Sequence, residues 1–338
     1  MRVFVAGGTG AIGRRLVRLL TAEGHQVVAT TRHADKAATL EAVGAVPVVV
    51  DALDREAVLE AVLEAEPDVV VHQLTALSGG GSLRRFDGQF AATNRLRTQG
   101  TDHLLEAARA AGARRFVAQS YAGWPYAREG GPIKSEGAPF DPGPPRHMRR
   151  SLDAIRHLED AVLGAPDIDG VVLRYGTFYG PGTGIAEDGD LVQLVRRRRL
   201  PVIGSGAGVW SFVHVDDAAE ATAAAIRLGA PAGVFNVVDD DPAPVREWLP
   251  ELAAAVGAEP PRRVPIALGR LFTGDVGVSL MTRVRGASNA KARDELGWRP
   301  RYESWRSGFR RGLGRVDNDG QRRPVHLHHA EGQSLPPS

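Results

Sequence analysis

The sequence has no cysteine among its 338 residues and no apolar run that approaches the roughly 20 residues of a membrane-spanning helix. The lack of cysteine excludes disulfides and thiolate metal sites, and we expect no metal centre of another kind. Met1 is followed directly by an apolar segment, without the basic segment and cleavage site of a secretory signal. We therefore expect a protein that has no membrane partner and is located in the cytoplasm.

Clustered basic residues are scarce as well. Lysine occurs only three times, at Lys36, Lys134 and Lys291, and the formal net charge is +2. The only dense basic run, residues 196–199, ends an apolar helical pattern, where the helix dipole favours cations. Recognition of nucleic acid needs basic residues gathered on one face together with stacking aromatics. We therefore expect no nucleic-acid partner. The expected partner is a small-molecule substrate, and the expected oligomeric state is a monomer or a homodimer.

The sequence does contain alternating short apolar segments and amphipathic helical patterns, which are typical of βαβ units and a parallel sheet. Predicted strands cover residues 2–6, 26–30, 46–50, 68–72, 115–118 and 170–173. Predicted helices cover residues 12–23, 34–43, 54–65, 93–111 and 151–163. Fully apolar segments such as residues 48–50 fit a sheet that is covered on both faces. The predicted fold is α/β: a doubly wound parallel Rossmann sheet with a smaller mixed substrate-binding lobe.

The loops divide the chain into two predicted units. We assign residues 1–175 and 209–238 to the Rossmann domain, and residues 176–208 and 239–316 to the substrate-binding lobe. Residues 317–338 are polar and contain Gly and Pro, so we expect a disordered tail. A metal site formed by the tail histidines is the less favoured alternative; these are His326, His328 and His329.

A glycine-rich turn follows the first predicted strand and opens the first predicted helix. Its spacing matches the pattern Gly-x-x-Gly-x-x-Gly, which in this context predicts a dinucleotide-binding turn. Glycines allow the tight turn and let the backbone approach a pyrophosphate, while the helix N-terminus offers free N–H groups to the phosphates. The predicted contacts are Gly7, Thr9, Gly10, Ala11, Ile12 and Gly13.

The end of the second strand favours NADPH over NADH as cofactor. An NAD site commonly carries Asp or Glu there to hold the ribose 2′-hydroxyl. This chain carries Arg32 instead, whose guanidinium can form two parallel hydrogen bonds with a 2′-phosphate. A solvated arginine without a ligand is the alternative interpretation.

Taken together, these motifs resemble the extended short-chain dehydrogenase/reductases, in the epimerase/dehydratase-like branch. The resemblance covers roughly residues 1–310. It rests on a series of motifs that are each weak alone but occur in the expected sequence order: the glycine turn, Asp51 with Asp54, residues 68–76, Asn94 with Gly100 and Thr101, residues 173–182, residues 212–218 and residues 296–300. It implies that Asp51 contacts the adenine, that the backbone of Leu74 and Thr75 passes the ribose and diphosphate, and that a nicotinamide pocket lies near residues 175–178. The cofactor contacts that follow are Asp51, Ala52, Gln73, Leu74, Thr75, Gln119, Tyr175, Gly176 and Phe178. A helix cap (Asp51, Asp54) and a packed strand end (His72) are the structural alternatives.

The sequence departs from this family at the residues that carry its acid–base chemistry. The family uses a Ser or Thr at the end of the fifth strand, and a Tyr followed four residues later by a Lys. Here Tyr121 falls on the Ser position with Ser120 just before it, while Ser151 and Ile155 fall on the Tyr and Lys positions. None of the five tyrosines is followed four residues later by lysine. The usual catalytic pair is therefore absent.

A further departure bears on the substrate. Members that act on sugar nucleotides tend to carry an Arg at the position of Trp210, where it grips the substrate diphosphate. Together with Trp124, Tyr121, Phe178 and Tyr179, this residue predicts a site for a flat, largely apolar ligand. Ordinary packing is the alternative for each aromatic taken singly. The predicted substrate contacts are Trp124, Tyr179 and Trp210.

We therefore predict an atypical NADPH-dependent ketoreductase that acts on a small, aromatic polyketide-type metabolite, because the chain resembles the atypical ketoreductases of antibiotic pathways. Ser120, Tyr121 and Asn94 would orient the carbonyl, and a proton would come from the substrate, from water, from Ser120 or from Tyr121. Two alternatives stay open at this point. One is a nucleotide-sugar epimerase or dehydratase, and the other is a regulator that senses NADP without turning it over.

Overall fold

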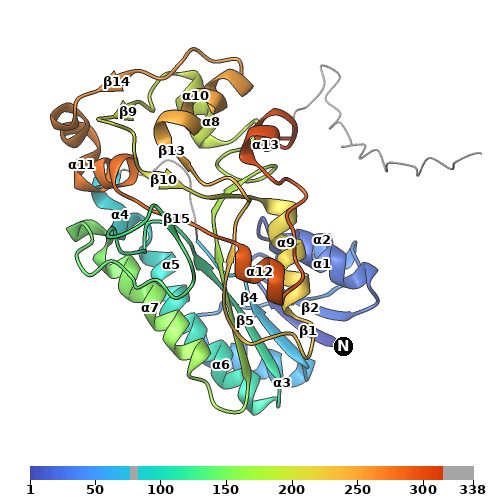
Figure 1. Ribbon diagram of the computed structural model, residues 1–338. Helices are drawn as coiled ribbons and strands as arrows, with labels where there is room; N and C mark the ends of the chain where they lie inside the picture. The colour runs from blue at the N-terminus through green and yellow to red at the C-terminus, as the bar shows by residue number, and fades with distance from the viewer. Residues whose placement is uncertain (77–82, 315–338) are drawn as a thin grey trace, which may run out of the picture.

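The computed structural model describes residues 1–76 and 83–314, and a seven-stranded parallel sheet lies at its centre (Figure 1). The strand order is β12-β7-β5-β4-β1-β2-β3. These strands are β1 (Arg2–Ala6), β2 (Gln26–Thr31), β3 (Val46–Val49), β4 (Val69–His72), β5 (Arg115–Tyr121), β7 (Asp169–Tyr175) and β12 (Gly233–Val237). Every neighbouring pair is parallel, with Val3 opposite both Val27 and Val69 at the centre. The predicted α/β Rossmann fold is confirmed.

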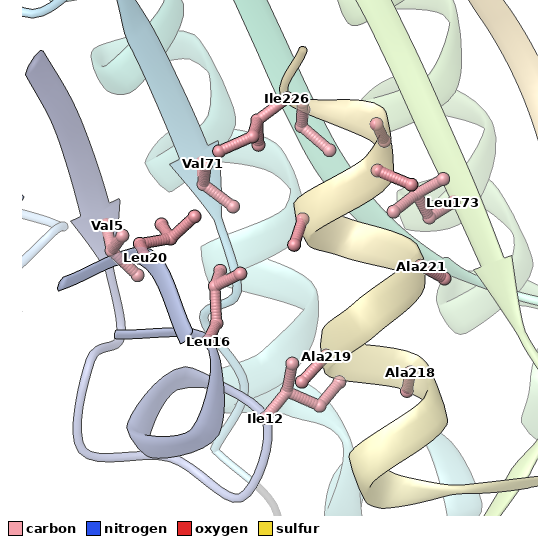
Figure 2. Close-up of a cluster of buried hydrophobic side chains, with 14 of the residues drawn as sticks. Val5, Ile12, Leu16, Leu20, Val71, Leu173, Ala218, Ala219, Ala221 and Ile226 are labelled. Carbon is pink, nitrogen blue, oxygen red and sulfur yellow. The ribbon is translucent and has the colours of Figure 1, made fainter. Parts of the chain in front are cut away.

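Helices cover both faces of the sheet. On one face lie α1 (Gly13–Ala22), α2 (Ala37–Glu41) and α9 (Val215–Ala225), and on the other α3 (Arg55–Ala65), α6 (Thr101–Ala110) and α7 (Arg149–Leu163). Figure 2 shows how the small side chains of α9, such as Ala218 and Ala221, let this helix lie close to α1 and to the sheet. Leu16 and Leu20 of α1 complete this buried layer, as their helical spacing predicts.

Two elements differ from the expectations. The helix predicted over residues 93–111 is divided into α5 (Ala91–Arg95), a π-helical turn (Leu96–Gly100) and α6. Strand β3 is the edge of the sheet, so Val46 and Val49 are 61% and 53% exposed. The prediction that residues 48–50 are covered on both faces is therefore wrong at Val49, because an apolar sequence alone does not distinguish an edge strand from a central one.

Most of the remaining elements lie beyond the carboxyl end of the sheet (Figure 1), and many of them pack around a third apolar core. Its centre is aromatic and includes Phe212, Trp248, Trp305 and Phe309. The short strands are β6 (Ile133–Lys134), β8 (Thr177–Tyr179), β9 (Val202–Ile203), β10 (Val209–Trp210), β11 (Phe212–His214), β13 (Ala243–Pro244), β14 (Arg263–Val264) and β15 (Gly286–Ala287). The helices are α4 (Phe86–Gln89), α8 (Asp190–Arg196), α10 (Val245–Ala255), α11 (Ile266–Thr282), α12 (Ala290–Glu295) and α13 (Trp305–Arg311). The predicted domain boundaries stay a prediction, and the predicted tail with its histidines lies outside the described residues.

Within residues 1–76 and 83–314, no helix is both long and apolar enough to cross a membrane. The same part of the chain contains no group of three or more side chains that could hold a metal ion. The basic run at residues 196–199 ends α8, where Arg196 and Arg198 form ion pairs with Glu187 and Glu259. This arrangement is that of a solvated helix end rather than a continuous basic surface.

Candidate cofactor and substrate site

The glycine turn lies between β1 and α1, where the strand order reverses at β1 and β4. Open α/β sheets bind ligands at this switch point. Gly7 has φ +94°, and a Cβ atom on Gly13 would lie 2.1 Å from the Gly7 carbonyl oxygen. The backbone N–H groups of Ala11 and Ile12 donate to no acceptor in the described part of the chain. The turn thus fits a diphosphate, because it combines close backbone approach with free donors at a helix N-terminus.

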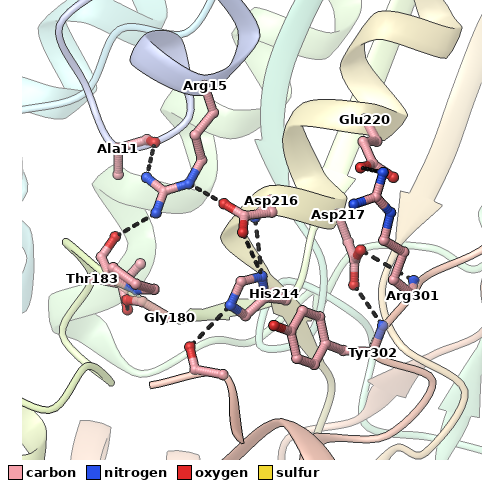
Figure 3. A network of polar contacts seen from close by, with 12 residues as sticks. Ala11, Arg15, Gly180, Thr183, His214, Asp216, Asp217, Glu220, Arg301 and Tyr302 are labelled. Carbon is pink, nitrogen blue, oxygen red and sulfur yellow. Dashed lines mark hydrogen bonds and ion pairs between the residues drawn. The ribbon is translucent and has the colours of Figure 1, made fainter. Parts of the chain in front are cut away.

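Arg15 fastens this turn to the second half of the chain (Figure 3). Its guanidinium donates to the carbonyl oxygen of Ala11 at 2.8 Å and to that of Pro181 at 2.9 Å, and it forms an ion pair with Asp216 at the start of α9. The backbone N–H of Asp216 in turn donates to Nδ1 of His214. Arg15 was not among the predicted contacts, although its place two residues after the last glycine of the turn is a usable signal.

The end of β2 provides the predicted 2′-phosphate contact. The carbonyl and hydroxyl oxygens of Thr30 accept hydrogen bonds from Gly8 and Gly7, which fixes the turn against β2. Thr9 contacts the hydroxyl of Thr31. Arg32 follows directly, is exposed, and has no hydrogen bond or ion pair with any described residue. Its guanidinium is therefore free to bind an anion beside the turn.

The predicted adenine contact closes a turn after β3. Asp51 is exposed and accepts a hydrogen bond from the Leu53 N–H, while Asp54 caps α3 by accepting from Ala57. Ala52 is buried, and its carbonyl oxygen contacts His103. Asp54 is thus a helix cap, and Asp51 keeps a carboxylate at the surface near the predicted adenine position.

The end of β4 holds a buried, neutral histidine. Nδ1 of His72 accepts a hydrogen bond from the Leu74 N–H, so Nε2 carries the proton and lies 3.2 Å from the Leu96 carbonyl oxygen. Burial lowers the pKa of His72 to about 4. Gln73 is also buried, and Leu74 and Thr75 are half-buried beyond it. His72 is therefore a packed strand end that orients residues 73–75.

The predicted nicotinamide region is built around a buried tyrosine. The Tyr175 hydroxyl accepts a hydrogen bond from Nε2 of Gln73 at 3.0 Å and contacts the Thr222 hydroxyl at 2.7 Å. Burial raises the pKa of Tyr175 to about 12. A Cβ atom on Gly176 would lie 2.8 Å from the Ser211 carbonyl oxygen, and Phe178 packs half-buried beside Tyr175. Tyr175 thus acts from the interior, by supporting Gln73 and Phe178.

Ser120 faces away from the predicted cleft. Its hydroxyl donates to Oε1 of Glu159 at 2.6 Å, and Glu159 forms a buried ion pair with Arg174 at 2.5 Å. Successive strand residues point to opposite faces, and Ser120 points toward α7. The half-buried Gln119 precedes it. We therefore do not retain Ser120 as a group that contacts the substrate.

Tyr121 does line a pocket, together with the two predicted tryptophans. The Tyr121 hydroxyl contacts the Thr177 hydroxyl at 2.9 Å, and burial raises its pKa. The Trp210 indole N–H donates to the Leu280 carbonyl oxygen at 2.9 Å, which fixes its ring. The pocket is small, about 20 Å³, and it exposes polar and apolar surface in nearly equal parts; its walls are formed by Tyr121, Ala122, Gly123, Trp124, Thr177, Val209, Trp210, Ser211, Leu280 and Val284.

The positions of the missing acid–base pair are filled by interior side chains. Nδ2 of Asn94 donates to the Ser151 hydroxyl at 3.1 Å, and this hydroxyl donates to Asp87 at 2.8 Å. Ile155 is fully buried in α7. Asn94, Ser151 and Asp87 thus form a local chain of hydrogen bonds that connects α5, α7 and α4, and no lysine is present among them.

Tyr179 is placed differently from the other aromatics. It is fully buried in the third core, with its ring edge against His214, Tyr302 and Phe309. We therefore do not retain Tyr179 as a substrate contact. Arg97 is a buried arginine in the π-helical turn, and no motif of the sequence indicated it.

The sequence matches a known protein family. The model of the NAD dependent epimerase/dehydratase family matches residues 3–237. The chain belongs to this family. A 3-diazoavenalumate denitrifying reductase from Streptomyces sp is 50% identical over 318 residues, which cover 92% of this chain and 100% of that protein. A 2-alkyl-3-oxoalkanoate reductase from Stenotrophomonas maltophilia (strain K279a) is 31% identical over 269 residues, which cover 76% of each protein.

The fold is similar to solved members of the family. The UDP-glucose 4-epimerase of Thermus thermophilus, determined in complex with NAD, aligns with a TM-score of 0.69 at 27% identity, over 93% of this chain and 98% of that one. The chain is thus a nicotinamide-dependent enzyme of the epimerase/dehydratase family, with reductases among its relatives, and it acts as an oxidoreductase.

Proposed function

We propose that this enzyme is an NADPH-dependent reductase that delivers hydride to a flat aromatic substrate without using an acid of its own. One observation carries the proposal: the pocket beside the predicted nicotinamide region is lined by Tyr121, Trp124 and Trp210, while the Tyr and Lys positions hold buried Ser151 and Ile155. Aromatic walls favour a planar ligand. The buried Ser151 hydroxyl already donates to Asp87, so it has no proton to offer the pocket.

The residues of the cofactor site fit an NADP molecule. Gly7, Gly10 and Gly13 with the free N–H groups of Ala11 and Ile12 would hold the diphosphate, and Arg32 the 2′-phosphate. When bound, NADPH supplies the hydride. The chain itself then has to orient the substrate ring and exclude water from the pocket.

The lack of an acid bears on the group that is reduced. Hydride addition to a ketone leaves an alkoxide that must take up one proton. Hydride that replaces nitrogen on an aromatic diazonium carbon gives a neutral arene and dinitrogen, and no proton is taken up. The Streptomyces relative at 50% identity is named as a denitrifying reductase of a diazo compound. We therefore propose an aromatic diazonium group as the hydride acceptor.

A direct test supplies two acceptors to the same enzyme. The purified protein is incubated with [4-²H]NADPH and either a benzenediazonium salt or acetophenone, with heat-denatured protein as the control for reaction in solution. We expect enzyme-dependent release of dinitrogen and one deuterium on the ring carbon that carried it, and no reduction of the ketone. Reduction of the ketone alone would instead establish the ketoreductase. Binding of NADPH without turnover of either acceptor would favour the sensor.

The ketoreductase stays the second candidate, because the Stenotrophomonas relative is named as a reductase of an oxoalkanoate. In that case, the Tyr121 hydroxyl, which lines the pocket, is the candidate proton donor to the substrate carbonyl. Its raised pKa and the lack of a neighbouring lysine make this phenol a weak acid catalyst.

Replacement of Tyr121 by phenylalanine separates the two candidates. If no protein proton is needed, we expect kcat to fall by less than about tenfold, because only positioning is lost. If Tyr121 is the acid, removal of a transition-state donor should lower kcat by roughly 10²-fold or more. Steady-state kinetics with whichever acceptor the enzyme reduces measure this difference. A large loss of kcat that occurs only with the ketone would identify Tyr121 as the proton donor and the enzyme as a ketoreductase.

Cofactor choice provides an independent prediction. We expect NADPH to bind at least about tenfold more tightly than NADH, because the exposed Arg32 guanidinium has no acidic partner and can pair with the 2′-phosphate. Arg32→Ala should weaken NADPH binding by roughly 10- to 100-fold and leave NADH binding unchanged. Isothermal calorimetry with both cofactors measures the effect, and NADH serves as the internal control. Equal affinities in the unmutated protein would contradict the assignment.

A further inference from the structure

The helix α11 changes character at Gly274. This glycine has φ +68° and ψ −170°, which is not helical, so it divides α11 into an outer half, residues 266–273, and an inner half, residues 275–282. The inner half is mostly buried and contributes Leu280 to the wall of the proposed substrate pocket. The outer half lies at the edge of the molecule (Figure 1). One helix therefore connects the pocket wall with the protein surface.

The outer half turns apolar side chains outward. Four of the ten large apolar side chains that are exposed in the described part of the chain belong to it, and Leu271 and Phe272 are 60% and 69% exposed. Its inward side contains Gly269, where a Cβ atom would lie 2.5 Å from the Ile203 side chain. Leu271 is two positions, or about 200°, from Gly269 around the helix. Leu268, Leu271 and Phe272 thus form an outward apolar surface, which we call the α11 face.

Arginines border the α11 face at both ends. Arg262 and Arg263 precede the outer half, at the start of β14. Arg84 packs at the other end, because a Cβ atom on Gly274 would lie 3.2 Å from the Arg84 Cγ atom. Arg85 follows, and all four arginines are exposed, with no side-chain hydrogen bond or ion pair to a described residue. The α11 face therefore lies between two pairs of uncompensated positive charges.

Few acidic groups offset this charge. Arg270, on the outer half itself, pairs with Asp275 at 2.9 Å. Residues 262–274 contain three arginines and no acidic residue, and the Glu259 carboxylate that precedes them is bound by Arg198. A second copy of the chain, seated through the same surface, would bring a second set of arginines to the same place. Repulsion between like charges opposes that occupant, and the charge of this surface favours an anionic one.

We propose that the α11 face binds the surface of an anionic phospholipid membrane, with its apolar side chains between the headgroups and the bordering arginines beside the phosphates. Exposed apolar surfaces of this kind mark sites of interaction. The face is convex, because it is the outer side of one helix, and a deformable bilayer interface can surround it, whereas a protein partner would need a matching groove. Attachment to a bilayer grows with the apolar area buried and with the attraction of basic residues to anionic lipids, and this surface offers both.

This contact goes beyond the proposed reaction, and it revises the expectation that the protein has no membrane partner. That expectation rested on the lack of a long apolar run in the sequence, which a contact at the bilayer surface does not need. Since the inner half of α11 contributes Leu280 to the proposed pocket, attachment would hold that pocket close to the bilayer.

Vesicle sedimentation with the full-length protein tests the proposal. The probes are vesicles of phosphatidylcholine alone and vesicles of two parts phosphatidylcholine to one part phosphatidylglycerol. We expect the partition coefficient to be at least about tenfold higher for the anionic vesicles, and to fall toward the neutral value at high salt, which screens the arginines. Leu271→Asp should lower binding to the anionic vesicles by at least about tenfold, and so should the double change of Arg84→Glu with Arg85→Glu.

Leu63→Asp is a matched control, because Leu63 is an exposed leucine of α3, on another side of the molecule (Figure 1). This variant should bind vesicles like the unmutated protein, and all variants should keep their Tm and NADPH affinity. Equal binding to neutral and anionic vesicles, no binding, or a loss no greater in Leu271→Asp than in Leu63→Asp would each overturn the proposal. Self-association that Leu271→Asp abolishes, in a protein that ignores vesicles, would assign the α11 face to a second copy instead.

Discussion

Replacement of Gly13 by alanine is expected to raise the NADPH dissociation constant by more than about 100-fold, because the turn cannot keep its shape around a side chain at this position. The added Cβ would lie 2.1 Å from the Gly7 carbonyl oxygen and 2.9 Å from the Gly8 Cα atom. Both are backbone atoms, so no flexible side chain can move away. The turn must then open, and its N–H groups no longer converge on one diphosphate. Fluorescence titration with NADPH measures the loss.

Gly131→Ala is a matched control, because a Cβ atom at that exposed glycine has no heavy atom within 4 Å. We expect this variant to bind NADPH with unchanged affinity. A circular dichroism spectrum of Gly13→Ala that matches the unmutated protein would confine the effect to the turn. NADPH affinity within about fivefold of the original in Gly13→Ala would contradict the role of the turn in binding the cofactor.

The second large effect concerns stability. Glu159→Gln should lower the free energy of unfolding by about 3–5 kcal/mol, because it leaves the buried Arg174 guanidinium without a counter-charge. Arg174 belongs to β7, and its guanidinium lies 4.6 Å from the centre of the Phe140 ring. Besides its bonds to Glu159, the guanidinium donates to the backbone oxygen of Glu136 and to the Tyr126 hydroxyl. Urea unfolding, followed by circular dichroism, measures the change.

Two controls distinguish the buried pair from ordinary surface ion pairs. Glu106 pairs with Arg55 on the surface, and Glu106→Gln should be barely measurable since solvent screens that pair. The double change of Glu159→Leu with Arg174→Met replaces the buried pair by apolar groups and should recover most of the lost stability. A double variant as unstable as Glu159→Gln would mean that the pair acts through its hydrogen bonds to Ser120 and Tyr126.

The core of the fold was predictable because periodicity and glycine spacing are local signals. The strand β1 agrees with its prediction at both ends, and α1, α3 and α7 agree within two residues. The edge position of β3 was not predictable, since it depends on which strands pair, and pairing is a long-range property. The π-helical turn was also missed, because one extra residue in a helix leaves hardly any trace in a hydrophobic pattern.

The candidate site shows the same limit at the level of single residues. The sequence could place Ser120 and Tyr121 at the end of one strand, but not decide which of the two faces the pocket. The pleat of β5 decides this, and it directs Ser120 toward Glu159. Tyr179 was selected as an aromatic near the cleft, yet the core that encloses it is built from residues more than 100 positions away, such as Tyr302 and Phe309.

Strand β3 has a consequence for how the protein behaves in a crowded solution. The Val50 N–H donates to the Thr31 carbonyl oxygen. Because the N–H groups of consecutive strand residues point in opposite directions, the backbone nitrogens of residues 47 and 49 point toward the open edge of the sheet. Residue 47 is proline, which has no N–H to offer. Val49 therefore supplies the single outward donor of this strand. An edge strand with a single outward N–H donor pairs poorly with a strand of another chain. Despite its exposed valines, β3 therefore does not favour aggregation through edge-to-edge strand pairing.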